Sequence, residues 1–284
     1  MRIKAYAKVN LSLDVTGKRP DGYHTLSSVF QSVSLYDNVS VAASDRLTVA
    51  FSDMELNNKV SLCFKAAKLF FETAQMSGGA EIYVENRIPR ASGLGGGSAD
   101  AAAVLVALNK LYGYPLTSEK LLDLALMLGA DVPFCVLGGT RLCEGIGEKM
   151  TELPSMPQCF IVIAKKGEKS STADMYRALD EFDDRRRPDT ARILNGLRSG
   201  DLYEMFRGAY NCFEAVTDSS ALAEIRTAAE SFGAVYCGIS GAGPSGILVF
   251  ENKSNAETAE RCLANSGFES FLSHPVGHGV EIID

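Results

Sequence analysis

Hydrophobic and polar residues alternate along the first segment of the chain, residues 3–15. One face carries only apolar side chains, and the other carries mostly polar ones. A period of two is typical of a β-strand with one buried face. Turn-forming residues follow at 20–22, and residues 23–42 return as a strand, so the pattern predicts a β-hairpin.

Helical spacing of apolar residues comes next. It predicts one helix within residues 58–76 and another from about Ser98 to Tyr112. A further helix is expected to begin at a cap formed by Thr117 or Ser118 and to end at Gly129.

The pattern of predicted strands and helices changes near residue 155. Residues 159–164 are typical of a buried strand, and residues 234–250 of a strand, a glycine loop and a second strand. Strands and helices are mixed without regular βαβ alternation, which favours an α+β fold. We therefore expect two domains, residues 1–155 and 156–284.

Composition and charge narrow the class of protein. The chain has 284 residues, 46% of them hydrophobic and 22% charged, as in a globular protein of one or two domains. The net charge of −7 argues against nucleic acid or an anionic membrane as a partner. The N-terminus lacks the apolar segment of a signal peptide, so we expect a cytoplasmic protein.

The cysteines support the same location. The chain has seven widely scattered cysteines, and no two of them form a Cys-x-x-Cys pair. This pattern indicates buried reduced thiols in a cytoplasmic protein. With only three histidines and no His/Cys cluster, a zinc site is not expected.

The stretch 89–103 reads PRASGLGGGSADAAA, with four glycines in five residues ahead of an alanine-rich helix. Glycine loses more conformational entropy on folding than any other residue, so this cluster needs a backbone reason. One reason is the binding of an anion by backbone N–H groups at a helix N-terminus. The sequence predicts a phosphate-binding loop, with a purely structural loop as the alternative.

Two common phosphate-binding motifs do not fit this loop. A Walker A motif needs a lysine, which is absent. A Rossmann motif needs a third glycine, where Ser98 stands, and a second parallel strand where a second helix is expected. Ser98 can instead cap the helix or offer its hydroxyl to a phosphate or a metal ion. Asp100 is expected to stabilise the first turn of the helix rather than to bind a ligand.

The pattern from Pro89 to Ser98 resembles the ATP-binding signature of the GHMP kinases, which include galactokinase, homoserine kinase and mevalonate kinase. Other segments, in order along the chain, resemble the members of that family that phosphorylate 4-diphosphocytidyl-2-C-methyl-D-erythritol in non-mevalonate isoprenoid biosynthesis. These segments are residues 5–37, 128–135, 144–148, 211–214 and 238–246.

The resemblance implies a kinase that uses ATP and Mg²⁺ to phosphorylate the 2-hydroxyl of that small molecule. It also implies the two-domain GHMP kinase fold. The N-terminal domain would be ribosomal protein S5-like, the C-terminal domain ferredoxin-like, and the active cleft would lie between them.

The resemblance further assigns roles to residues. Lys8 and Asp131 fall on the kinase centre, with Asp131 as the general base. The residues implied for ATP binding are Pro89, Gly93, Leu94, Gly95, Gly96, Gly97 and Ser98. The residues implied for substrate binding are Asn10 near the methylerythritol, Tyr23, His24 and Tyr176 around the cytosine, and Gly241 and Gly243 near the transferring phosphate.

The chemistry of these side chains fits the roles. Lys8 and Asn10 are two residues apart and share the polar face of the first strand, which in isolation would be taken for a solvated face. Lys8 supplies positive charge where phosphate charge must be stabilised. Asp131 would in isolation be taken for a helix cap, but it can also accept the proton of an attacking hydroxyl. The ring of Tyr23 can stack on a base.

Four residues depart from the usual pattern of the family. Ala99 replaces a serine, and Ala91-Ser92 stands where Gly-Ala is usual. Ser61 stands where an asparagine often helps to hold adenine. These departures concern the nucleotide contacts rather than the chemistry.

Two other functions stay open. One is a GHMP kinase for homoserine or a mevalonate derivative, although such an acceptor needs no aromatic residue at Tyr23. The other is a ligand-binding protein without catalysis, which would not need both Lys8 and Asp131. The expected partner is a small molecule rather than nucleic acid or membrane, a homodimer is left open, and the metal ligands are unassigned.

Overall fold

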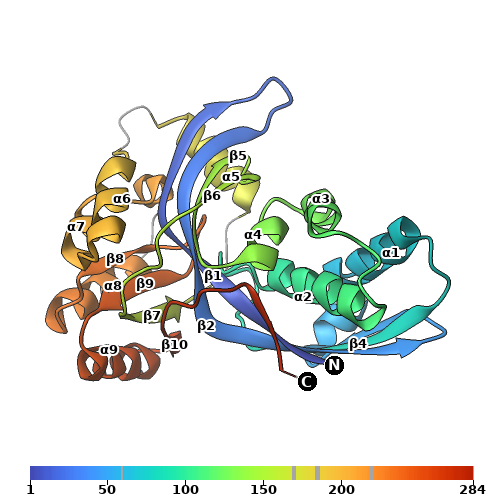
Figure 1. Cartoon of the computed structure of the whole chain (residues 1–284). Coiled ribbons are helices and arrows are strands. Elements are labelled where there is room, and N and C mark those ends of the chain that lie inside the picture. The colour runs from blue at the N-terminus through green and yellow to red at the C-terminus, as the bar shows by residue number, and fades with distance from the viewer. Residues whose placement is uncertain (59, 168–170, 183–185, 218–219, 284) are drawn as a thin grey trace.

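A computed structural model describes residues 1–58, 60–167, 171–182, 186–217 and 220–283 of the chain (Figure 1). The described part contains two β-sheets and helices packed around them. The strands of the first sheet are β1 (Arg2–Lys18), β2 (His24–Ser44), β3 (Thr48–Phe51), β4 (Gly79–Glu85), β5 (Thr140–Gly145), β6 (Lys149–Glu152) and β11 (Val280–Ile282). The strands of the second sheet are β7 (Phe160–Lys165), β8 (Tyr236–Ile239), β9 (Gly246–Phe250) and β10 (Glu269–Ser273).

The helices fall into two groups along the chain. The first group comprises the 3₁₀ helix η1 (Met54–Asn58), α1 (Leu62–Ala74), α2 (Gly96–Leu111), α3 (Ser118–Leu128) and α4 (Val132–Leu137). The second group comprises α5 (Thr172–Asp180), α6 (Thr190–Ser199), α7 (Leu202–Arg207), the 3₁₀ helix η2 (Cys212–Ala215), α8 (Ser220–Ser231) and α9 (Lys253–Asn265). The mixture of the two sheets with these helices confirms the expected α+β class.

The predicted hairpin is present and spans the molecule. β1 and β2 pair antiparallel along almost their whole length, and Figure 1 shows them running between the two groups of helices. One expectation was wrong, since residues 5–15 of β1 are buried on both faces rather than on one. The polar side of the strand faces the interior of the protein, so its Lys8, Asn10 and Ser12 are satisfied by protein groups.

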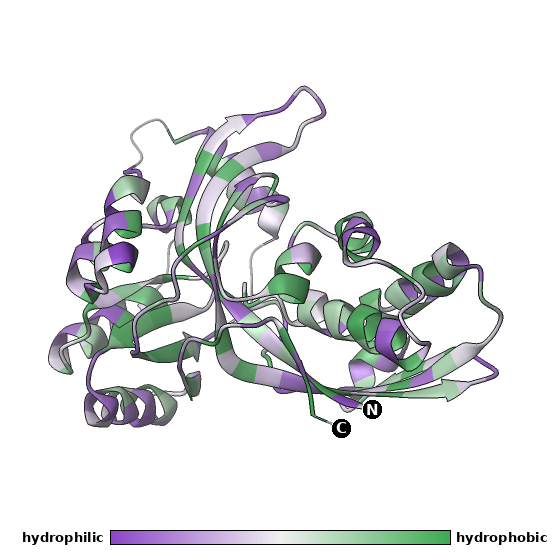
Figure 2. Cartoon of the chain, in the orientation of Figure 1, coloured by the Kyte–Doolittle hydropathy of each residue, from purple (hydrophilic) through white to green (hydrophobic). Residues whose placement is uncertain are grey.

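Helix α2 forms the centre of the first half. It contacts β1, β2, α1 and α4, and its small alanines are fully buried. Figure 2 shows α2 as largely hydrophobic, whereas the strands beneath it are mixed and the outer helices carry hydrophilic faces. This core fixes the start of α2, and therefore the glycine-rich loop, against the sheet.

The first and last residues of three helices can be compared with their predicted bounds. α3 begins after the cap Thr117, whose side chain accepts a hydrogen bond from Lys120 N, and ends at Gly129, as predicted. α1 begins only at Leu62, after Ser61, whose side chain accepts a hydrogen bond from Phe64 N. α2 begins at Gly96, because Gly95 takes the cap position.

The second sheet has the order β10-β7-β9-β8 and packs against α8 and α9. The last strand of the chain, β11, leaves this half and pairs antiparallel with β1 in the first sheet. The division at residues 155 and 156 remains a prediction, and the strand β11 ties the two parts of the chain together.

Two expectations on composition can be compared with the structure. The seven cysteines are all free, and five of them are buried, whereas Cys262 is exposed. Among the described residues, no helix combines the length and the apolar character that a membrane span requires.

Candidate active site

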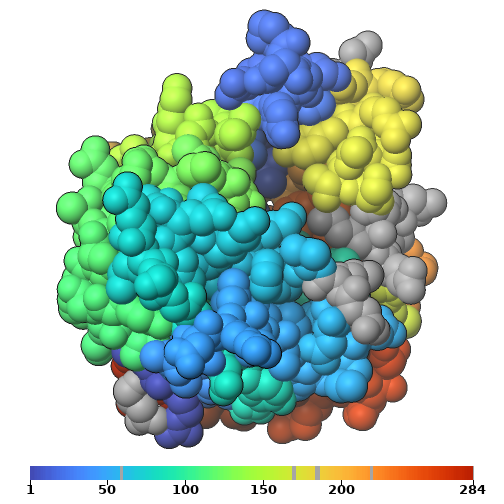
Figure 3. All heavy atoms as spheres, turned by 90° about the vertical axis from the view of Figure 1, so that its right-hand side faces the viewer, coloured from blue at the N-terminus to red at the C-terminus, as the bar shows by residue number. Residues whose placement is uncertain are grey.

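A cavity of about 780 Å³ lies where the first sheet, the start of α2 and the C-terminal elements meet. Its walls come from β1, the loop before α2, α1, the start of α4, α5 and the loop after β8. Figure 3 shows a hollow in this region, between the blue tip of the β1–β2 hairpin, the yellow segment around α5 and the cyan and green N-terminal helices.

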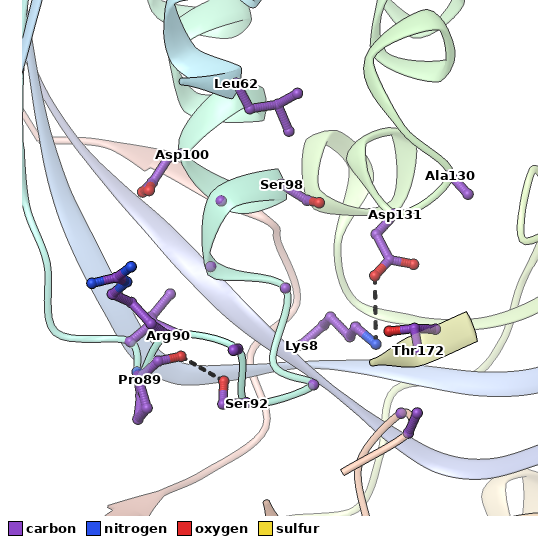
Figure 4. A pocket seen from close by; sticks show the side chains of 18 of the residues that line it. Lys8, Leu62, Pro89, Arg90, Ser92, Ser98, Asp100, Ala130, Asp131 and Thr172 are labelled. Carbon is purple, nitrogen blue, oxygen red and sulfur yellow. Dashed lines mark hydrogen bonds and ion pairs between the residues drawn. The ribbon is translucent and has the colours of Figure 1, made fainter. Parts of the chain in front are cut away.

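Lys8 and Asp131 meet inside this cavity. Lys8 is 4% exposed, and its Nζ lies 3.6 Å from Asp131 Oδ2 (Figure 4). Asp131 occupies the cap position of α4, yet its side chain makes no capping hydrogen bond. The carboxylate instead points toward Lys8, so the helix-cap interpretation does not account for it.

Asn10 orients the same ammonium group. Its Oδ1 accepts a hydrogen bond from Lys8 Nζ at 2.7 Å, and its Nδ2 donates to Ser28 Oγ at 2.9 Å. Lys8 Nζ also lies 4.7 Å from the centre of the Phe30 ring. These contacts hold the lysine head group in one place without neutralising its charge.

The glycine-rich loop is packed too closely for side chains at two positions. Gly93 has a φ of 80°, and a Cβ there would lie 2.3 Å from the carbonyl oxygen of Ser240. Gly95 has a φ of 73°, and a Cβ there would lie 3.1 Å from the Lys8 side chain. Both backbone conformations favour glycine. The loop thus needs its glycines to approach both β1 and the C-terminal loop.

The N-terminus of α2 opens into the cavity. Gly95 to Ser98 line it, and the first-turn N–H groups of the helix have no side-chain cap. Ser98 therefore does not cap α2, and Figure 4 shows its hydroxyl on the side of Asp131. Free N–H groups and the positive end of the helix dipole favour an anion at this point.

Two of the residues expected to bind ATP differ in their placement. Pro89 lines the cavity, and its carbonyl oxygen accepts a hydrogen bond from Ser92 Oγ. Leu94 is fully buried in the hydrophobic core, so only its backbone belongs to the loop. The Leu94 carbonyl accepts a hydrogen bond from Lys8 N, which fastens the loop to β1.

Ser240 joins three parts of the site and was missed from the sequence. Its Oγ accepts a hydrogen bond from Asn10 N at 3.2 Å and donates to the Gly93 carbonyl at 3.1 Å. Gly241 follows and lines the cavity, whereas Gly243 lies outside its lining. Ser240 lies within the family-like segment 238–246, but its role was not predicted because its partners come from two distant segments.

Two of the three aromatic residues expected around cytosine, His24 and Tyr176, are in contact in the structure. The rings of His24 and Tyr176 are stacked, with centroids 4.5 Å apart and an interplanar angle of 16°. Tyr176 also packs edge-on against Phe213, and burial raises its pKa to about 12. Tyr23 is 64% exposed and does not join this group.

Asp180, which the sequence did not single out, holds His24 from the other side. Its Oδ1 lies 2.8 Å from His24 Nε2, and its Oδ2 accepts a hydrogen bond from Lys18 Nζ at 2.7 Å. These bonds tie the C-terminal end of α5 to both strands of the hairpin.

A mostly apolar recess forms the far side of the cavity. Phe51, Leu56, Leu62 and Ile88 line it, together with the carboxyl groups of Asp37 and Asp100. Ser61 also lines the cavity, but its hydroxyl is engaged as the cap of α1. The expectation that Asp100 stabilises the first turn of the helix was wrong, because α2 begins at Gly96 and Asp100 lies beyond its first turn, where its side chain is buried beside Asp37.

Two domain families match the chain. The family described as GHMP kinases N terminal domain matches residues 61–139, and GHMP kinases C terminal matches residues 193–269. Together they cover more than half of the sequence. The chain belongs to the GHMP kinase family, and the expected GHMP kinase fold is confirmed.

Relatives narrow the placement within the family. The chain is 39% identical over 262 residues to 4-diphosphocytidyl-2-C-methyl-D-erythritol kinase of Clostridium acetobutylicum, covering 90% of this chain and 93% of the relative. It is 37% identical over 281 residues to the enzyme of the same name from Clostridium tetani, covering 97% and 100%. It thus groups with the 4-diphosphocytidyl-2-C-methyl-D-erythritol kinases.

Solved structures agree with this grouping. A crystal structure of 4-(cytidine 5′-diphospho)-2C-methyl-D-erythritol kinase superimposes with a TM-score of 0.83 at 33% identity, covering 98% of this chain and 100% of that one. Homoserine kinase from Cytophaga hutchinsonii superimposes with a TM-score of 0.77 at 19% identity, covering 100% and 97%. The second likeness concerns the fold alone. The chain is accordingly a small-molecule kinase.

Proposed function

We propose that the protein transfers the γ-phosphoryl group of ATP to the 2-hydroxyl of 4-diphosphocytidyl-2-C-methyl-D-erythritol, a step of non-mevalonate isoprenoid biosynthesis. The observation that carries the proposal is the cavity itself. It brings the uncapped N-terminus of α2, the Lys8–Asp131 pair and the ring of Tyr176 to one space.

Asp131 is the proposed general base. It accepts the proton of the acceptor hydroxyl as that oxygen forms its bond to the γ-phosphorus and the bond from phosphorus to the leaving ADP oxygen breaks. Lys8, 3.6 Å from Asp131, places a fixed positive charge beside the reacting atoms. This charge stabilises the negative charge that gathers on the transferring group.

The start of α2 is the proposed site of the ATP phosphates. The N–H groups of Gly96 to Ser98, which precede the first intrahelical bond from Ala99 N to Gly95 O, and the Ser98 hydroxyl offer donors to phosphate oxygens. No group of three or more His, Cys, Asp or Glu side chains suited to a metal ion occurs in the described ranges. Mg²⁺, which we expect as the partner of ATP, would be held chiefly by phosphate oxygens and water.

The aromatic group at His24 and Tyr176 is the proposed cytosine site. The two rings are stacked on each other, and Tyr176 lines the cavity at the part of its wall that α5 forms. A base stacked on an aromatic side chain gains about 1–3 kcal/mol. Homoserine and mevalonate carry no base, so this group favours the cytidyl substrate over them.

The test is direct. Purified protein is incubated with Mg-ATP and 4-diphosphocytidyl-2-C-methyl-D-erythritol, and ADP release and product mass are followed. We expect a gain of one phosphoryl group that requires both substrates. ADP release with homoserine or mevalonate, and none with the cytidyl compound, would reject the proposed acceptor but keep the kinase.

A further inference from the structure

Two buried aspartates touch each other at the side of the cavity away from the reacting pair. Asp37 comes from β2 and is 1% exposed, and Asp100 comes from the first turns of α2 and is 3% exposed. Their carboxyl groups share a hydrogen bond. Figure 4 shows Asp100 pointing to the opposite side of the start of α2 from Ser98 and Asp131.

Asp37 is anchored by the backbone that leads into the glycine-rich loop. Its Oδ1 accepts hydrogen bonds from Arg87 N at 2.5 Å and Ile88 N at 2.7 Å. Two N–H donors favour the ionised form of this carboxyl. Asp37 is therefore the acceptor of the shared hydrogen bond, and Asp100 is the carboxylic acid that donates.

The surroundings of the pair keep one proton on it. Burial is the largest cause that raises the pKa of Asp100, and the charge of Asp37 is the second. The Asn86 side chain contacts Asp37, and the buried thiols of Cys63 on α1 and Cys135 on α4 are near enough to sense the charge of Asp100. Burial raises the pKa of both thiols, so neither adds a charge.

One oxygen of Asp100 has no partner. Its Oδ1 is buried and accepts no hydrogen bond from any described residue, although Asp100 lines the cavity. A buried acceptor without a partner costs about 1–3 kcal/mol. The neighbouring walls are apolar, with Phe51, Leu56 and Ile88, and suit a flat ring that brings its own hydrogen-bond donor.

We propose that Asp100, positioned by Asp37, accepts a hydrogen bond from the nucleoside part of ATP and thereby selects the phosphoryl donor. The proposal rests on the proposed function, in which ATP binds along the start of α2. The donor is an exocyclic amine of the base or a ribose hydroxyl, since both have the same hydrogen-bonding chemistry. Asp37 thus acts as a positioning residue and Asp100 as a specificity residue.

Two substitutions of Asp100 distinguish an effect on nucleotide binding from an effect on folding. Asp100→Leu removes the acceptor, and we expect the Kd of a non-hydrolysable ATP analogue to rise about tenfold, the loss of one good hydrogen bond. Asp100→Asn keeps an acceptor oxygen and donates to Asp37 through its amide, so the Kd should stay within about twofold of the unsubstituted protein. Isothermal titration calorimetry measures both values without the second substrate.

Analogues of ATP identify the donor. Purine riboside triphosphate lacks the exocyclic amine, and 2′-deoxy-ATP and 3′-deoxy-ATP each lack one ribose hydroxyl. One of them should bind about tenfold more weakly than ATP to the unsubstituted protein and equally weakly to Asp100→Leu. If Asp100→Leu binds every nucleotide as the unsubstituted protein does, Asp100 does not contact the nucleoside.

Asn109→Leu is the matched control. Asn109 is buried on the same helix, but its side chain bonds to the backbone of Leu116, away from the cavity. This substitution should lower the Tm without changing the Kd for nucleotide. An equal loss of affinity in this control would mean that general loosening of α2 explains the effect.

The shared proton supplies a readout that is independent of activity. Asp100 binds its proton more tightly in the folded chain than in the unfolded chain, where its pKa is about 3.9. Stability must therefore fall as pH rises above about 4 toward the raised pKa of the folded state. We expect Asp100→Asn to abolish this fall. The difference in Tm between this variant and the unsubstituted protein should therefore be larger, in favour of the variant, at pH 8 than at pH 5. Parallel pH profiles would reject the proton-sharing pair.

The outcomes also separate this proposal from the proposed function. A protein that binds ATP through Asp100 but does not phosphorylate the cytidyl compound would refute only the acceptor. Suppose instead that the protein phosphorylates the cytidyl compound, and that Asp100→Leu binds the ATP analogue with an unchanged Kd. Those two results would refute only the role of Asp100.

Discussion

The ring of Tyr176 lies flat against the ring of His24, 4.5 Å from centroid to centroid. The first residue comes from α5 in the second half of the chain, and the second from the start of β2. A cytosine bound here would stack on the outside of an aromatic pair to which both halves contribute one ring. Substrate binding would therefore link α5 to the hairpin.

Replacing Tyr176 tests the proposed cytosine site. Tyr176→Leu keeps an apolar contact with Phe213 but removes the aromatic face. We expect the KM for the cytidyl substrate to rise about 5- to 150-fold, which corresponds to about 1–3 kcal/mol of stacking, with the KM for ATP unchanged. Tyr203→Leu serves as the control, because Tyr203 is exposed and bonds to Glu251 outside the cavity. A change confined to the KM for ATP would mean that the two sites are assigned the wrong way round.

Asp180 offers a finer test of the same site. Asp180→Asn weakens the contacts to His24 and Lys18, both of which rely on the carboxylate charge. Because Asp180 is one third exposed, we expect only a two- to fivefold rise in the KM for the cytidyl substrate, consistent with about 1 kcal/mol or less. The unsubstituted enzyme should lose affinity with added salt, and the variant should do so less.

Asp174→Asn is the matched control for that experiment. Asp174 lies on the same helix, but it pairs with Arg177 and Ser171 rather than with the hairpin. If both variants raise the KM equally, a general effect on α5 would explain the result and Asp180 would have no particular role.

Local sequence patterns were sufficient to predict those parts of the fold in which a segment determines its own conformation. The hairpin was predicted from periodicity, and α3 from its spacing, a cap at Thr117 or Ser118 and an end at Gly129. Each of these features depends on neighbouring residues or on a motif.

Other features depend on the tertiary fold and left no such signal. The strand β11 returns to pair with β1, and this pairing helps to bury a strand that alone looks half-exposed. The contact between Asp37 and Asp100 joins a strand to a helix far along the chain. Ser98 was a reasonable cap by residue type, but the left-handed Gly95 starts the helix earlier.

Asp131 is the residue on which the chemistry depends most. Asp131→Asn preserves the shape of the side chain but removes its ability to take a proton. We expect kcat to fall about 10²- to 10⁴-fold while the Kd of an ATP analogue changes little. Asp123→Asn on the exposed face of α3 is the control and should leave kcat unchanged. Turnover by Asp131→Asn at the unsubstituted rate would remove Asp131 from the mechanism.

Gly93 tests how tightly the two glycine-containing loops are packed. In Gly93→Ala the new methyl group would lie 2.3 Å from the Ser240 carbonyl oxygen, at a φ of 80° that alanine disfavours. We expect the free energy of unfolding to fall by about 2 kcal/mol or more, measured by urea denaturation. Gly97→Ala in the same loop is the control for stability, since a Cβ there meets nothing within 4 Å and the position is helical. Its stability should stay the same or rise by about 0.5–1 kcal/mol. Equal losses in both variants would show that glycine content alone, rather than the approach of Ser240, determines the cost.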